Sequence, residues 1–128
     1  MQIILSMKNF INWFEIPVRD FNRALMFYST ILDAEISESE MFGTKMGFFP
    51  SDGSNVSGAI VKGDDYNPSD GGVTVYLNGG DDLQPVLNRV QQSGGSIILP
   101  KTLISPEMGF MAMFIDTEGN KIALHSNA

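Results

Sequence analysis

The side chain best suited to take part in a reaction is Glu15, which lies within the otherwise apolar segment Phe10–Val18. In a strand, alternate residues share a face, so Glu15 would point the same way as Trp13, and Phe14 and Ile16 the opposite way. A semi-buried carboxylate in a groove would have a raised pKa and could act as a base or bind a polar group. The alternative is a carboxylate that only faces water or pairs with a lysine.

His125 is the only histidine in the chain. Alternation places it on the same strand face as Ala123, with Ile122 and Leu124 on the other. An imidazole can transfer protons near neutral pH, so His125 could assist catalysis. A hydrogen-bonded histidine near the end of a strand explains the residue equally well.

Other candidates would line a ligand site. Trp13, the single tryptophan, could stack on a flat ligand, or it could be a core or interface residue. Met111 and Met113 share a strand face, and their flexible side chains suit either an adaptable apolar pocket or core packing. We expect Lys45 on the corresponding face of an earlier strand, where it could meet an anionic ligand or simply be solvated.

Composition and motifs exclude several classes of site. The chain has no cysteine, which removes disulfides, thiolate metal ligands and cysteine nucleophiles. No nucleophile lies near His125 in the sequence, and Gly71-Gly72 and Gly94-Gly95 lack the spacing of a nucleotide-binding fingerprint. The net charge is −7 and the eight basic residues are scattered, which argues against nucleic-acid binding.

The length of 128 residues, with 43% apolar residues, suits one compact domain with a sizeable core. No segment approaches the roughly 20 apolar residues of a membrane helix. The N-terminus lacks the pattern of a signal peptide, so we expect a cytoplasmic protein. Residues 1–9 look like a lead-in, and Met7 is an alternative start.

Hydrophobic periodicity predicts the element order β-α-β-β-β twice over, separated by a linker at residues 63–72. Amphipathic helices are expected over residues 21–32 and 83–92, the first capped by Asp20 and the second by Asp81-Asp82. The predicted strands are 10–18, 35–38, 43–49, 56–62, 73–77, 96–99, 109–115 and 121–125.

The repeated order indicates an internal duplication, with modules at about 10–63 and 72–126 within a single domain spanning 1–128. The shared element order is stronger evidence than the matched letters. Superposed by sequence, Trp13 aligns with Val73, Glu15 with Val75, Phe48 with Phe114, Ala59 with Ala123 and Val61 with His125.

Two segments carry a resemblance to a known family. The first is Trp13–Asp20, followed by Ala24 and Phe27-Tyr28, and the second is Gly109–His125 with its Asp116–Asn120 turn. Together they resemble the vicinal oxygen chelate superfamily, which includes glyoxalases, bleomycin resistance proteins and extradiol dioxygenases. The resemblance implies an α+β fold, in which two βαβββ modules form curved mixed sheets around a groove. The turn residues themselves would be mostly scaffold.

The resemblance also identifies where a metal would bind in family members that use one. Those ligand positions correspond here to Trp13, Ala59, Val73 and Ala123, none of which has a donor group suited to a divalent metal. A shift of two residues along each strand gives only Glu15 and His125 as donors, and a catalytic zinc site needs three. We therefore expect no metal cofactor.

Three functions remain open from the sequence. The first is a metal-free protein of the bleomycin-resistance type that binds a small apolar or planar molecule. The second is a lyase or isomerase of the glyoxalase type, using Glu15, with help from His125, for proton transfer. The third is a structural or regulatory module that acts through dimer contacts. The resemblance implies a homodimer, and open sheets have edges that association can cover.

Overall fold

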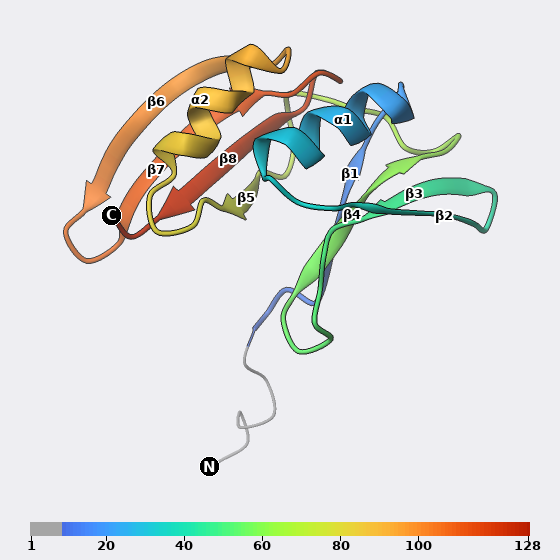
Figure 1. Ribbon diagram of the computed structural model, residues 1–128, viewed down its shortest axis with the longest axis horizontal. Helices are drawn as coiled ribbons and strands as arrows, with labels where there is room; N and C mark the ends of the chain where they lie inside the picture. The colour runs from blue at the N-terminus through green and yellow to red at the C-terminus, as the bar shows by residue number, and fades with distance from the viewer. Residues whose placement is uncertain (1–8) are drawn as a thin grey trace.

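The computed structural model describes residues 9–128. The alternative start at Met7, and the expected lead-in except for its last residue, lie outside the described residues. The chain forms two four-stranded mixed sheets, each accompanied by one helix (Figure 1). The first sheet has the strand order β1-β4-β3-β2, with β1 parallel to β4 and the other pairs antiparallel. Its module consists of β1 (Trp13–Pro17), α1 (Phe21–Ile31), β2 (Ser37–Met41), β3 (Thr44–Phe48) and β4 (Ser57–Lys62).

The second module repeats this topology, with the strand order β5-β8-β7-β6 and β5 parallel to β8. The predicted α+β fold of two βαβββ modules is therefore confirmed. No strand pairing joins the two sheets within residues 9–128, so they do not close into a barrel. The elements of this module are β5 (Val75–Asn78), α2 (Gln84–Gln92), β6 (Ser96–Ser105), β7 (Gly109–Ile115) and β8 (Lys121–Ser126).

Only α1 begins at the capping residue that the sequence predicted, because α2 has no side-chain N-cap. Asp20 caps α1 as predicted, because its carboxylate accepts the backbone N–H of Arg23 at 3.1 Å. The predicted start of α2 was one residue too early, since the N-cap is Leu83, with a proline in the first turn. Asp82 still accepts the N–H of Gln84 at 2.9 Å. Neither helix has the length and hydropathy needed to cross a bilayer.

Strand β6 is longer than predicted, continuing to Ser105 where the prediction ended at Leu99. Pro100 has no N–H group and would normally end a central strand. However, β6 is an edge strand, and its register with β7 shifts between Leu99 and Thr102. Such irregular edge positions accept a proline, so the strand resumes beyond it.

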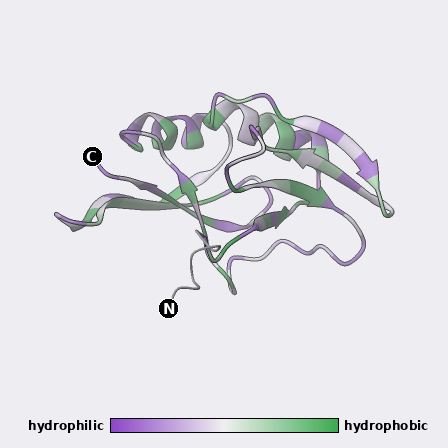
Figure 2. Ribbon diagram, turned by 90° about the horizontal axis from the view of Figure 1, so that it is seen from below, coloured by the Kyte–Doolittle hydropathy of each residue, from purple (hydrophilic) through white to green (hydrophobic). Residues whose placement is uncertain are grey.

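Both helices lie on the same side of the two sheets (Figure 2), and one apolar core fills the space between. The rings of Phe27 in α1 and Phe114 in β7 are 5.9 Å apart, so the first helix packs against the second sheet. Arg89 of α2 donates from Nε to the backbone oxygen of Ile31 in α1 at 2.9 Å. The two modules therefore share one core, and the opposite face of each sheet points away from the helices.

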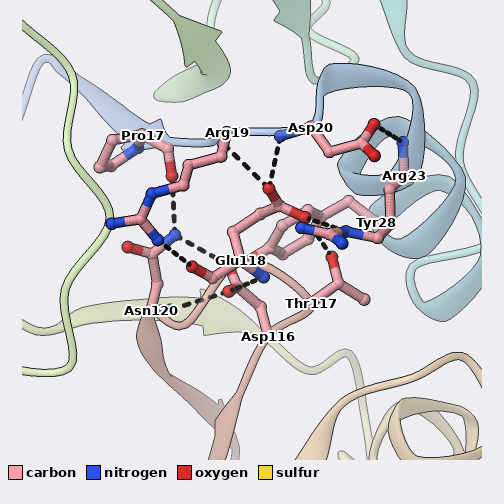
Figure 3. Close-up of polar contacts among 9 residues, drawn as sticks. All are labelled: Pro17, Arg19, Asp20, Arg23, Tyr28, Asp116, Thr117, Glu118 and Asn120. Atoms are coloured by element: carbon pink, nitrogen blue, oxygen red, sulfur yellow. Dashed lines mark hydrogen bonds and ion pairs between the residues drawn. The ribbon is translucent and has the colours of Figure 1, made fainter.

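The turn between β7 and β8 fixes the start of α1 (Figure 3). One oxygen of Glu118 accepts the backbone N–H groups of Arg19 and Asp20 at 2.9 and 2.7 Å, and the other pairs with Arg23 Nε at 2.7 Å. Burial acts to raise the pKa of Glu118, but the hydrogen bonds from Arg23, the two backbone groups and Thr117 outweigh it. The pKa is held at about 2.

Two further residues of this turn extend the network. Asp116 accepts the hydroxyl of Tyr28 at 2.5 Å, and burial together with this carboxylate raises the pKa of Tyr28 well above its usual value. The side-chain amide of Asn120 donates to the backbone oxygen of Pro17 at 2.8 Å, and its oxygen accepts the N–H of Ser69 in the linker at 3.0 Å. The turn thus holds β1, α1 and the linker together as scaffold.

Candidate functional site

The face of the first sheet that points away from the helices carries both Trp13 and Glu15. Strand register places Glu15 beside Ala59 of β4. Ala59 in turn is buried with Met46 and Val61 in a small apolar cluster, separate from the main core. The predicted shared face of Trp13 and Glu15 is therefore what the strand pairing produces.

Two aromatic side chains hold the carboxylate of Glu15. The hydroxyl of Tyr66, from the linker, donates to Oε1 at 2.9 Å, and the indole N–H of Trp13 donates to Oε2 at 3.3 Å. The hydrogen bond to Glu15, reinforced by its negative charge, raises the pKa of Tyr66. The side chain of Glu15 is exposed, so the semi-buried environment expected from the sequence is absent.

A groove of about 1060 Å³ runs between β1 and β5 and includes this cluster. Its volume lies just above the range of about 300–1,000 Å³ that is typical of sites for drug-sized molecules. Trp13 and Tyr76, on opposite strands, are 44% and 50% exposed, so aromatic surface is available on both sides. Of the described residues lining the groove, Glu15 is the only charged one, and the others are apolar, aromatic or neutral polar: Asn9, Phe10, Ile11, Trp13, Phe14, Leu32, Ala34, Phe49, Pro50, Val56, Ser57 and residues 73–78.

His125 lies elsewhere, in a second depression of about 640 Å³ on the other module. Its Nε2 is 2.6 Å from the backbone oxygen of Met108, so that nitrogen carries the proton and donates. Met111 is beside His125 in the strand register and lines the same depression, whereas Met113 is beside Ala123. Glu15 and His125 therefore line different depressions, which adjoin at residues 76–78 of β5.

The predicted position of Lys45 on the groove face is wrong. Lys45 pairs in register with Lys62 and Glu40, while its neighbour Met46 pairs with Val61 on the groove face. Lys45 instead lies on the helix-facing side, with Nζ 4.9 Å from the centre of the Phe21 ring. Because successive strand residues point to opposite faces, an error of one residue reverses the side chain completely.

The alignment of the two modules was also wrong by one residue at the start of β5. Tyr76 pairs with Ala123 as Glu15 pairs with Ala59, so Tyr76 rather than Val75 is the counterpart of Glu15. Thr74, not Val73, is then the counterpart of Trp13. A threonine hydroxyl is outside the imidazole, carboxylate and thiolate set that divalent metals prefer. Within residues 9–128 no group of three or more His, Asp or Glu side chains is placed to hold a metal ion.

Sequence reasoning missed Tyr66 and Tyr76. Tyr66 lies in the segment interpreted as a linker, where the available signal was a single aromatic side chain among Gly, Asp, Asn, Pro and Ser. Tyr76 was placed within the right strand, but the misaligned register assigned it no role. Tyr66 supplies a hydrogen-bond donor to Glu15, and Tyr76 lines the side of the groove formed by β5.

Comparisons with known proteins agree with this architecture. The sequence profile of the glyoxalase/bleomycin resistance protein/dioxygenase superfamily matches residues 10–124. No curated protein matches the chain significantly. Among solved structures, a variant of glyoxalase I from Zea mays is 13% identical and gives a TM-score of 0.72, covering 92% of this chain. The match spans only 45% of that enzyme chain.

Two matching structures of similar length come from a Streptomyces species. The antibiotic binding protein TnmS3 is 22% identical, with a TM-score of 0.67, over 94% of this chain and 97% of that one. A glyoxalase/bleomycin resistance protein is 24% identical, with a TM-score of 0.68, over 89% of this chain and 97% of that one. At these identities the likeness shows the fold, and the match of the family profile over most of the chain shows the family. The chain belongs to the glyoxalase/bleomycin resistance protein/dioxygenase superfamily.

Proposed function

We propose that this protein is a small-molecule binding protein that holds an apolar or planar molecule in the groove between β1 and β5. The observation that carries the proposal is the groove itself, which has about 1060 Å³ and a mostly apolar and aromatic lining. Trp13 and Tyr76 are exposed on opposite strands, where their rings could contact two sides of a flat molecule. An antibiotic binding protein with the same fold provides a precedent for this use of the architecture.

We further propose that binding requires no metal. With the corrected alignment, the positions that hold a metal in other family members are Trp13, Ala59, Thr74 and Ala123, which lack the usual donors. The nearest carboxylate, Glu15, already accepts hydrogen bonds from Tyr66 and Trp13. Recognition would therefore depend on apolar contact and hydrogen bonding.

The alternative of a glyoxalase-type lyase or isomerase receives less support from the geometry. It would have Glu15 remove a proton with the help of His125, but the two side chains line different depressions. The imidazole also uses its Nε2 proton in a bond to the backbone of Met108. An enzyme would have to use Glu15 as the base without His125. Among the described residues, the side chains that donate hydrogen bonds to Glu15 are the hydroxyl of Tyr66 and the indole of Trp13.

Binding can be tested with acridine, a flat tricyclic molecule that is neutral in mildly alkaline buffer. Because Trp13 is the only tryptophan and lines the groove, we expect saturable quenching of its fluorescence. In equilibrium dialysis Trp13→Ala should weaken acridine binding by up to about tenfold, since an aromatic contact adds ~0.5–1.5 kcal/mol beyond burial.

Met111→Ala provides the matched control, because Met111 lines the depression beside His125 and not the groove. This variant should bind acridine as the wild-type protein does. Loss of binding in Met111→Ala but not in Trp13→Ala would place the ligand in the wrong depression. Absence of saturable binding to the wild-type protein, tested also with larger planar molecules, would contradict the proposed function.

A further inference from the structure

The groove contains a carboxylate that forms no ion pair with any basic residue in the described part of the chain. Glu15 is the only charged residue among the described residues that line the groove, and the protein as a whole carries a net charge of −7. The two ion pairs found within residues 9–128 join Arg23 to Glu118 and Lys101 to Asp82, so neither involves Glu15. An anionic ligand would therefore meet like charge in this groove.

The neighbours of Glu15 orient its charge without neutralising it. Tyr66 and Trp13 each donate one hydrogen bond to a different carboxylate oxygen. A carboxylate has about four acceptor sites, so these two bonds leave acceptor capacity on both oxygens. Both donors are themselves neutral, and the side chain of Glu15 remains exposed.

The same surroundings favour a positive charge for a second reason. The Trp13 ring lies 6.0 Å from the Phe48 ring, and both are on the face that carries Glu15. The face of an aromatic ring attracts a nearby cation, and a tryptophan does so most strongly. A cation next to Glu15 would therefore gain from both the carboxylate and the adjacent indole.

One basic residue, Lys121, lines a smaller depression of about 220 Å³ that also reaches Glu15. It is not among the residues lining the main groove, and it forms no ion pair with Glu15 in the structure. Its position makes it the residue to test as an internal neutralising group.

We propose that the groove selects a cationic planar ligand: an aromatic ring system carrying a protonated or quaternary nitrogen, with the nitrogen next to Glu15 and the rings between Trp13 and Tyr76. This inference rests on the proposed function and specifies its ligand class. Glu15 acts as the counter-charge, and Tyr66 holds the carboxylate in place.

The test compares N-methylacridinium, a permanent cation, with acridine, which is neutral in mildly alkaline buffer. The two molecules have nearly the same ring system, so they differ mainly in charge. Affinities are measured by equilibrium dialysis at low ionic strength. We expect the wild-type protein to bind the cation about tenfold more tightly than acridine. Glu15→Gln should reduce that preference severalfold, leaving only the part that comes from the Trp13 indole.

Glu38→Gln is the matched control, because Glu38 is exposed on the opposite face of the same sheet and its change alters net charge equally. It should keep the preference for the cation. If Glu38→Gln lost the preference as Glu15→Gln does, the effect would come from overall charge and the proposal would be wrong. The wild-type protein could instead show no preference, with Lys121→Met alone preferring the cation. That result would show that Lys121 neutralises Glu15, and the proposal would be wrong.

The outcomes separate this inference from the proposed function. Equal binding of acridine and N-methylacridinium would leave the groove as a binding site and reject only the cationic ligand class. Failure of both molecules to bind, with Glu15→Gln behaving like the wild-type protein, would reject the proposed function as well. Raising the salt concentration should reduce the preference for the cation, because ions screen exposed charges.

Discussion

The hydroxyl of Tyr66 and the indole N–H of Trp13 together fix the orientation of Glu15 on the groove face. Neither donor carries charge, so the carboxylate keeps its charge available to a ligand. The arrangement also makes Tyr66 sensitive to Glu15, since a nearby negative charge disfavours the phenolate. That coupling provides a spectroscopic measure of the site that needs no ligand.

Glu15→Gln should lower the pKa of Tyr66 towards the usual tyrosine range. The hydrogen bond and negative charge of Glu15 raise that pKa in the wild-type protein, and the neutral amide removes the charge. The measurement is an ultraviolet titration of the phenolate, with Tyr66→Phe used to identify which transition belongs to Tyr66. An unchanged Tyr66 transition in Glu15→Gln would contradict the observed contact.

Metal analysis tests the donor chemistry of the same face. Purified protein should bind zinc, nickel, manganese or iron no better than weakly, because Trp13, Ala59, Thr74 and Ala123 lack imidazole, carboxylate or thiolate groups. Elemental analysis after dialysis measures this directly. Stoichiometric metal that survives dialysis and is lost in Glu15→Gln would contradict the account.

At the scale of single residues, simple alternation predicted the shared face of Trp13 and Glu15, because β1 is regular and its apolar residues mark the buried side. The same rule failed for Lys45, whose strand was aligned one residue out of register. Tyr66 could not have been predicted, since its contact with Glu15 is across 51 residues and depends on the path of an irregular segment.

The turn between β7 and β8 adds polar contacts between the modules to their shared core, through Glu118, Asp116 and Asn120 (Figure 3). These residues lie in the second module but bond to β1 and α1 of the first. The site depends on this element, because Asn120 holds both the end of β1 and the linker that carries Tyr66.

Glu118→Gln should destabilise the protein at neutral pH by about 1–3 kcal/mol, since the buried group loses its charge-assisted bond to Arg23. Denaturant unfolding measures the loss, and Glu38→Gln, at an exposed position, is the control. A Glu118→Gln variant as stable as Glu38→Gln would contradict the assigned role.

The pH dependence of stability should also change in this variant. The pKa of Glu118 is about 2 in the folded protein, below its value near 4.5 in the unfolded chain. Its ionised carboxylate therefore stabilises the folded protein at pH values above 4.5. This contribution, about 3 kcal/mol, is lost as the pH falls towards 2. Glu118→Gln should therefore show a weaker loss of stability on acidification than the wild-type protein.

At the scale of elements, the sequence predicted both helices and the repeated strand order, because their apolar periodicities are long and regular. The extension of β6 beyond Pro100 was not predictable from local rules, since only its place at the sheet edge permits a proline. The 116–120 turn was interpreted correctly as scaffold, but its hydrogen-bond partners in the first module could be identified only from the tertiary structure.

The two sheets remain open on the face away from the helices, and several apolar side chains are exposed at the groove margin. Phe10 is 96% and Val73 91% exposed. Such surface is often covered by association, and the resemblance to the family favours a homodimer. Light scattering at micromolar concentration should therefore give twice the 14.0 kDa chain mass. A monomer alone would contradict this expectation.

The location of a bound planar molecule tests the central claim most directly. A crystal structure of the protein with acridine should show the rings in the groove between β1 and β5, in contact with Trp13 and Tyr76. Acridine bound only in the depression beside His125 and Met111, with the groove free of ligand, would contradict the account.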